Sequence, residues 1–189
     1  MKKGTEIPTI DVALVTIKTY EMAAEEIALN TSNQIAVTIA TEDIDAVKLI
    51  VKEKLIAQKP AKRIVTGNTI VITDNVFNPE LTLILQGGTI IYDATDPTKI
   101  IGYHPPKVGE TANNKIFELN AYSAIYDAGG VITGYERISY PNCQGVPISL
   151  SSQDGVFRAP EYTINSAASA GESPYEIEYV ADLPPVQAA

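Results

Sequence analysis

Residues 115–140 read KIFELNAYSAIYDAGGVITGYERISY, and this stretch decides the fold class. Phe117, Leu119 and Ile125 fall on one face and Glu118 on the other, which is the two-residue period of a half-buried strand. The segment Asp127-Ala128-Gly129-Gly130 predicts a turn, because glycine adopts the positive φ angles that tight turns require. Residues 131–140 follow this turn as a second predicted strand, so the stretch predicts a β-hairpin.

Further segments of the same kind lie on both sides of this hairpin. Residues 35–39 alternate as a strand does, and residues 63–73 predict a strand with a glycine bulge, or a tight hairpin, around Gly67. Residues 45–58 fit either a strand or an amphipathic helix; their β-branched content and the stop at Lys59-Pro60 favour a strand. Further strands are predicted at residues 89–92, 99–103, 161–164 and 175–179.

One segment predicts a helix. Asn78 suits the N-cap, Pro79 the first helical position and Glu80 the positive end of the helix dipole. The pair Gly87-Gly88 ends the segment. Because isolated helices shorter than about 12 residues are marginal in water, we expect this helix to pack on a sheet.

The pattern as a whole, roughly eight to ten strands and one short helix, predicts a mainly β protein: a β-sandwich or partial barrel with a packed helix. The chain has 189 residues, with no fixed repeat and no linker-like break, so we expect a single domain. The N-terminal arm to about residue 18 and the C-terminal tail, residues 183–189, have few neighbours in sequence. We expect both to order on contact with another subunit.

Composition excludes several functional classes. Asp and Glu number 23 against 14 Lys and Arg, which gives a formal charge of −9 and a pI near 4.6. Such a charge disfavours binding to nucleic-acid phosphates or anionic lipid. No apolar run is long enough to predict membrane insertion, and none follows Lys2 and Lys3 as a signal peptide requires. Cys143 is the single cysteine, which is typical of a reducing compartment.

The sequence predicts no catalytic, cofactor-binding or metal site. His104 is the only histidine, which removes every His-pair metal site, and its place between Tyr103 and Pro105 favours a surface loop over a catalytic base. Cys143 has no basic neighbour in sequence to lower its pKa, so we interpret it as a buried thiol. We therefore expect no enzyme activity and no cofactor.

Three weaker patterns receive structural interpretations. Gly87-Gly88 and Gly129-Gly130 lack the spacing of phosphate-binding loops and are read as turns. The acidic cluster Glu42, Asp43 and Asp45 lacks the glycine and the distal Glu of an EF-hand, so a solvated acidic face is favoured over a calcium site. Paired glycosidase carboxylates stay open as a possibility, although the chain has no Trp to line a sugar-binding cleft.

Turn-and-strand signatures extend over most of the chain from about residue 30 to residue 179. They are AVKLIVK (46–52), AQKP (57–60), TGNTI (66–70), TDNVFNPEL (73–81), LQGG (85–88), ISYPNCQG (138–145), DGVFR (154–158) and PEYTINS (160–166). Together they resemble a group of major tail, or tail tube, proteins from phages, prophages and phage-tail-like particles of Gram-positive bacteria.

The resemblance implies a structural subunit of a virion tail, assembled in the cytoplasm of the host bacterium. Six copies would close into a ring, and rings would stack into a hollow tube for DNA passage. Implied partners are further copies of the chain, a tape measure protein, a tail terminator, baseplate or distal tail proteins and, in a contractile tail, a sheath. Specific nucleic-acid binding is not expected.

An acidic wall suits such a tube, because it repels the phosphates of passing DNA. Six copies at −9 would carry 6 × −9 = −54 formal charges per ring. Our candidates for carboxylates that face the lumen are Glu42, Asp43 and Asp45.

Two other functional classes stay open. A β-sandwich binding module, of the carbohydrate-binding or adhesin kind, is weakened by the lack of Trp and of an export signal. The second open class is an enzyme of unrecognised type. Tubes or six-fold rings by negative-stain microscopy would support the tail subunit, whereas a glycan-dependent rise in melting temperature without assembly would support the binding module.

Overall fold

The structure is a computed structural model that describes residues 7–22, 26–112 and 115–186. Those residues form twelve strands and one helix, and the sheets stay open without closing into a barrel. The predicted mainly β class with one short helix is confirmed. The elements are β1 (Thr9–Thr19), β2 (Glu26–Leu29), β3 (Ser32–Ile44), β4 (Val47–Val51), β5 (Lys54–Lys59), β6 (Lys62–Asp74), α1 (Pro79–Gln86), β7 (Thr89–Tyr92), β8 (Ile100–His104), β9 (Phe117–Tyr126), β10 (Ile132–Gly145), β11 (Glu161–Ser166) and β12 (Glu176–Val180).

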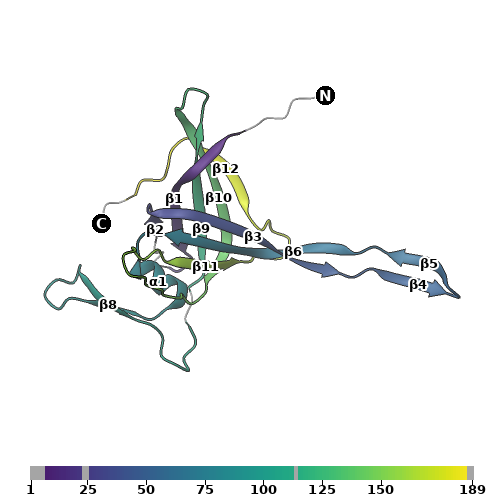
Figure 1. Cartoon of the computed structure of the whole chain (residues 1–189), viewed down its shortest axis with the longest axis horizontal. Helices are drawn as coiled ribbons and strands as arrows, with labels where there is room; N and C mark the ends of the chain where they lie inside the picture. The colour runs from purple at the N-terminus through teal and green to yellow at the C-terminus, as the bar shows by residue number, and fades with distance from the viewer. Residues whose placement is uncertain (1–6, 23–25, 113–114, 187–189) are drawn as a thin grey trace.

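Most strands join one antiparallel sheet in the order β2-β1-β9-β10-β11-β6-β3, with β12 beside β10. Figure 1 shows β1, β9, β10 and β12 running across the direction of β3, β6 and β11, so the sheet folds over on itself. The corner lies in β10, which pairs with β12 through residues 135–139 and with β11 through residues 143–145. An irregularity between Tyr140 and Cys143, with Asn142 at a φ of 48°, gives β10 the bend that this change of partner requires.

The predicted hairpin is formed by β9 and β10. Pairing runs from Ile132 opposite Tyr126 to Cys143 opposite Phe117. In the turn, a carboxylate oxygen of Asp127 accepts hydrogen bonds from the backbone N–H groups of Gly129 (2.8 Å) and Val131 (2.9 Å). This turn confirms the prediction that the glycine-rich segment reverses the chain.

The hydrophobic core lies where the two parts of the folded sheet and α1 meet. The members with 0–1% exposure come from five strands and the helix: Val15, Ile17, Ile70, Ile72, Leu81, Ile84, Leu85, Phe117, Leu119, Cys143, Tyr162 and Ile164. β1, β6, β9 and β11 each contribute a pair of alternate residues, as a face buried at period two demands, and β10 contributes Cys143.

The predicted helix is confirmed as α1. Asn78 is its N-cap and accepts a 2.9 Å hydrogen bond from the backbone N–H of Leu81, and Gly87, with a φ of 75°, ends it. Leu81, Ile84 and Leu85 face the core, which is the packing that so short a helix requires.

Two sequence expectations need correction. The described residues form twelve strands, above the eight to ten expected, and residues 45–58 form the hairpin β4–β5, not one strand. Its turn is made by Lys52 and Glu53, which are non-glycine residues with positive φ angles of 46° and 64° and therefore give no sequence signal for a turn. Around Gly67, β6 is continuous and carries a register shift opposite Ala40 and Thr41, so the bulge alternative is correct.

The N-terminal expectation is also corrected. Residues 9–19 are β1, paired with β9 along its length and with β2 over residues 15–18, and Val15 and Ile17 are fully buried. The expectation that this segment orders on contact with another subunit is wrong for residues 9–19, which are held by their own chain. Sequence neighbours do not reveal pairing with a strand about one hundred residues away. Residues 1–6 lie outside the described part of the chain.

The C-terminal tail is described as far as residue 186. From β12 it returns to the β1–β2 edge, where Pro184, Pro185 and Val186 line a hollow with Thr16 and Glu26. The expectation that the tail orders on a neighbouring subunit stays a prediction for residues 187–189, which lie outside the described residues.

Candidate assembly surface

The most distinctive surface is a two-stranded ribbon that we call the projecting hairpin, residues 40–66. Figure 1 shows it leaving the body at the ends of β3 and β6, with β4 and β5 at its tip. The third strand on this side, β11, pairs with β6 only over residues 68–73, so beyond Asn68 each ribbon strand has only the other as its partner. Thirteen residues of extended chain give the hairpin a reach of about 40 Å.

Every residue of the projecting hairpin is solvent-exposed. Large aliphatic side chains are nonetheless frequent along it, each between 40% and 65% exposed: Ile44, Val47, Leu49, Ile50, Val51, Leu55, Ile56, Ile64 and Val65. Exposed aliphatic side chains at this frequency in one segment favour an interaction site. A two-stranded hairpin without a third element is also marginally stable in water, which gives the ribbon a second reason to need a partner.

The charge of the hairpin tip is opposite to that of the body. Residues 47–59 contain four lysines and Glu53, so their formal charge is 4 − 1 = +3, and the rest of the chain carries −9 − 3 = −12. A basic ribbon on an acidic body is complementary to another copy of the same body, and long-range attraction of this kind orients and speeds association.

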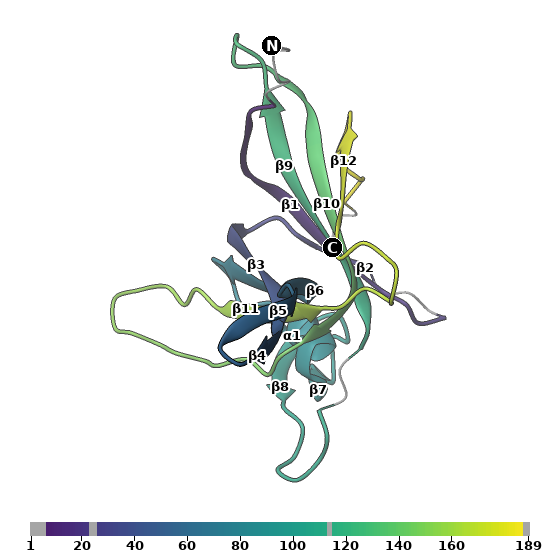
Figure 2. The ribbon, with the colours of Figure 1, turned by 90° about the vertical axis from the view of Figure 1, so that its right-hand side faces the viewer.

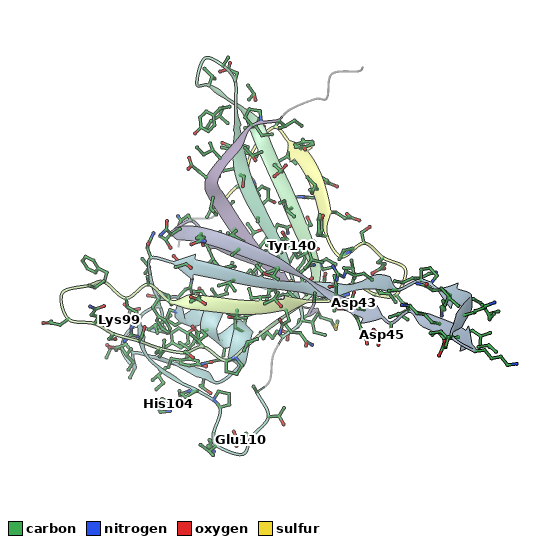
Figure 3. The ribbon with its side chains drawn as sticks, turned by 45° about the vertical axis from the view of Figure 1, so that its right-hand side comes forward. Asp43, Asp45, Lys99, His104, Glu110 and Tyr140 are labelled. Atoms are coloured by element: carbon green, nitrogen blue, oxygen red, sulfur yellow. The ribbon has the colours of Figure 1, made fainter. Side chains whose placement is uncertain are left out.

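The predicted acidic cluster lies at the root of the projecting hairpin (Figure 3). Glu42 and Asp43 lie in β3, and Asp45 follows its end. Arg63 of β6 donates hydrogen bonds to both carboxylate oxygens of Asp43, at 2.7 and 3.0 Å, and this pairing lowers the pKa of Asp43 below its ordinary value. All three acids are exposed. Their role in a lumen stays a prediction.

A second acidic surface escaped the sequence analysis. On the outer face of β9, β10 and β12, a hollow of about 610 Å³ is lined by Glu118, Glu172 and Glu176 together with Arg137. The guanidinium of Arg137 lies 2.5 Å from a carboxylate oxygen of Glu178. These acids come from three separate segments, so only the strand pairing brings them together.

Among the described residues, β2 and β3 end the main sheet, and two further strand edges, at β12 and at the start of β1, are also unpaired. β12 pairs with β10 on one side only, and residues 9–14 of β1 pair with β9 on one side only. Figure 2 shows β1 and β12 at opposite sides of the upright part of the sheet. Ile10 at one edge and Tyr179 at the other are both 57% exposed. Free edges of this kind template pairing with another chain.

The residues considered for catalysis lie apart from each other. His104 is exposed at the end of β8, in the lower part of the view in Figure 3, whereas Cys143 is fully buried in the core. Burial raises the pKa of the Cys143 thiol to about 12, so the neutral form persists at neutral pH. The interpretation of Cys143 as a buried thiol is confirmed.

The described residues contain no group of three or more His, Cys, Asp or Glu side chains placed to hold a metal ion. Within the same residues, no helix has the length and hydropathy of a membrane span.

Comparison with known proteins adds little to this geometry. No family model matches the sequence, and no curated protein matches it. One similar solved structure is described as the "Cryo-EM structure of the anti-feeding prophage (AFP) baseplate, 6-fold symmetrised", with 9% sequence identity, a TM-score of 0.37 and 93% of each chain covered. A TM-score at this level does not establish a common fold. The identification of the assembly surface therefore rests on the geometry of this chain alone.

Proposed function

We propose that this chain is a non-enzymatic structural subunit that assembles with copies of itself into the tail tube of a phage or phage-tail-like particle. The observation that carries the proposal is the projecting hairpin, whose 27 residues are all exposed and include nine large aliphatic side chains. Burial of apolar surface is worth about 25 cal/mol per Å², so this ribbon gains stability by lying on another molecule. The sequence likeness to tail tube proteins supports the same role.

The partner of the hairpin is another copy of the chain. A contact between a projecting element of one copy and the body of the next is heterologous, and such contacts generate rings or open stacks instead of closed dimers. The basic tip and the acidic body favour this head-to-tail arrangement over contact between two tips.

Ring closure uses the unpaired strand edges. The edge of β12 in one copy and the edge of β1 in the next extend the upright sheet from subunit to subunit, with main-chain hydrogen bonds across the junction. In the proposed assembly, six copies close one ring and the projecting hairpins connect successive rings. The lumen is acidic, with Glu42, Asp43 and Asp45 as the candidate residues, and it passes DNA without binding it.

Assembly of the purified protein tests the proposal. The wild-type chain should form six-fold rings or tubes by negative-stain microscopy. The variant Leu49→Thr/Ile50→Thr/Leu55→Thr/Ile56→Thr places β-branched threonine, which favours strands, at four hairpin positions and removes apolar surface, so it should fold and stay monomeric. Ile101→Thr/Val108→Thr is the matched control, because both side chains are exposed and lie outside the hairpin. The proposal is contradicted if the wild type stays monomeric at high concentration, or if the hairpin variant assembles as the wild type does.

A further inference from the structure

The loop between β10 and β11 presents an almost fully exposed aromatic side chain. Phe157 is 94% exposed and its neighbour Val156 is 62% exposed, although both residue types are normally buried. Arg158 follows directly; its guanidinium donates a 2.9 Å hydrogen bond to Ser152 and makes no ion pair within the described residues. Aromatic and arginine side chains are the residue types that most often dominate protein–protein interfaces.

A pocket of matching chemistry lies between β2, α1 and β7. Its volume is about 300 Å³, and its apolar walls come from Ile27, Leu83, Ile90 and Tyr92. Two carboxylates, Glu26 and Glu80, complete the lining. An apolar pocket with acids beside it suits an aromatic side chain followed by a guanidinium.

The β10–β11 loop projects away from the body. In Figure 2 it extends to the left, while α1 and β7 lie at the centre and β2 to the right. Phe157 is 94% exposed, so it does not fill the pocket of its own chain. It is therefore free to contact a neighbouring copy.

We infer that Phe157 and Arg158 of one copy dock into the β2–α1–β7 pocket of the adjacent copy. Phe157 fills the apolar part of the pocket, and the Arg158 guanidinium pairs with Glu26 or Glu80. The occupant is a second copy because the charges are complementary and because the loop projects away from its own body. In Figure 2 the β1 edge lies on the side to which the loop extends and the β12 edge on the other side, so a copy that pairs its β12 edge with β1 also lies beside the loop.

This inference rests on the proposed self-assembly and names a contact within it. Phe157→Ser and Arg158→Glu should each weaken self-association of the full chain by about tenfold or more, measured by sedimentation at several protein concentrations. The melting temperature of Phe157→Ser should stay at the wild-type value, because Phe157 is 94% exposed. That of Arg158→Glu should fall by no more than the loss of the exposed hydrogen bond to Ser152 explains. Lys107→Glu, the same charge change in another exposed loop, should leave association unchanged.

A charge swap separates a specific contact from a general effect of the loop. Glu26→Arg alone should weaken association, and Arg158→Glu combined with Glu26→Arg should recover at least part of it. If the wild type assembles and Phe157→Ser assembles equally well, the docking contact is wrong and the tail-tube proposal stands. If the wild type does not self-associate at all, both are wrong.

Discussion

Gly145 of β10 lies directly against the backbone of Leu85 in α1. A Cβ atom at Gly145 would come within 2.4 Å of the Leu85 Cα and within 2.5 Å of its carbonyl oxygen. The close approach holds the helix on the sheet at the point where β10 has turned the corner toward β11. Backbone atoms cannot move aside as a flexible side chain can, so only glycine fits.

Gly145→Ala should therefore destabilise the protein by about 1–3 kcal/mol, the usual cost of forcing extra volume into a packed core. Chemical denaturation followed by circular dichroism measures the change in the free energy of unfolding. Gly102→Ala is the control, because its added Cβ would meet only side-chain atoms of Ile91, at 3.4 Å and beyond. Equal stability of the two variants would show that the helix is not held by this contact.

Asn78→Ala should destabilise the protein by about 1 kcal/mol, because the cap accepts a hydrogen bond from the first turn of a helix that has only 8 residues. Asn78→Ser keeps a capping oxygen and should recover most of the loss. Thermal unfolding of the two variants measures the difference. If serine is no better than alanine, the side-chain cap does not contribute.

Stability should fall at high pH. Burial raises the pKa of Cys143 from 9.0 to about 12 and that of Tyr140 from 10.0 to about 12, so the folded state keeps protons that the unfolded state loses. The contribution of these two groups to the free energy of unfolding is fully present below their pKa values in the unfolded state. It is lost as the pH rises from about 9 toward 12. Denaturation midpoints across this range measure the loss. Cys143→Ala should show a smaller decrease than the wild type, and an unchanged decrease would contradict the assignment.

The same burial predicts the reactivity of the thiol. Cys143 should resist iodoacetamide at neutral pH in the folded protein and react in denaturant, because the thiolate is the reactive form. Mass spectrometry measures the alkylated fraction in the folded protein and in denaturant. Rapid alkylation of the folded protein would mean that the β9–β10 region opens readily.

Charge reversal at Glu42, Asp43 and Asp45 should increase the retention of DNA by assembled tubes, if these acids face the lumen. Glu118→Lys/Glu172→Lys/Glu176→Lys makes the same change in charge on the outer face of β9, β10 and β12 and serves as the comparison. Retention by tubes of each variant can be measured with labelled DNA fragments. If only the comparison variant retains DNA, the lumen is lined by that face and the hairpin acids lie elsewhere.

The sequence predicted those elements whose signals are local. The alternation of residues 117–125 and the glycine-rich turn gave β9–β10, and Asn78, Pro79 and the following apolar face gave α1. The β4–β5 turn was missed because Lys52 and Glu53 adopt positive φ angles without glycine. The place of β1 was missed for a different reason, since its partner strand is distant in the chain.

The candidate surface was predictable only in part. The sequence placed apolar and basic residues together between residues 46 and 63, but their exposure depends on β11 ending its pairing at Asn68. The acidic hollow and the β2–α1–β7 pocket each combine segments far apart in sequence. Surfaces of that kind follow from strand order, which local patterns do not specify.

Negative-stain microscopy of the purified 189-residue chain at increasing concentration tests the central claim most directly. The account predicts rings with six-fold symmetry, or tubes built from them, that disappear when the apolar residues of the projecting hairpin are replaced by threonine. Particles that stay single at every concentration would contradict it.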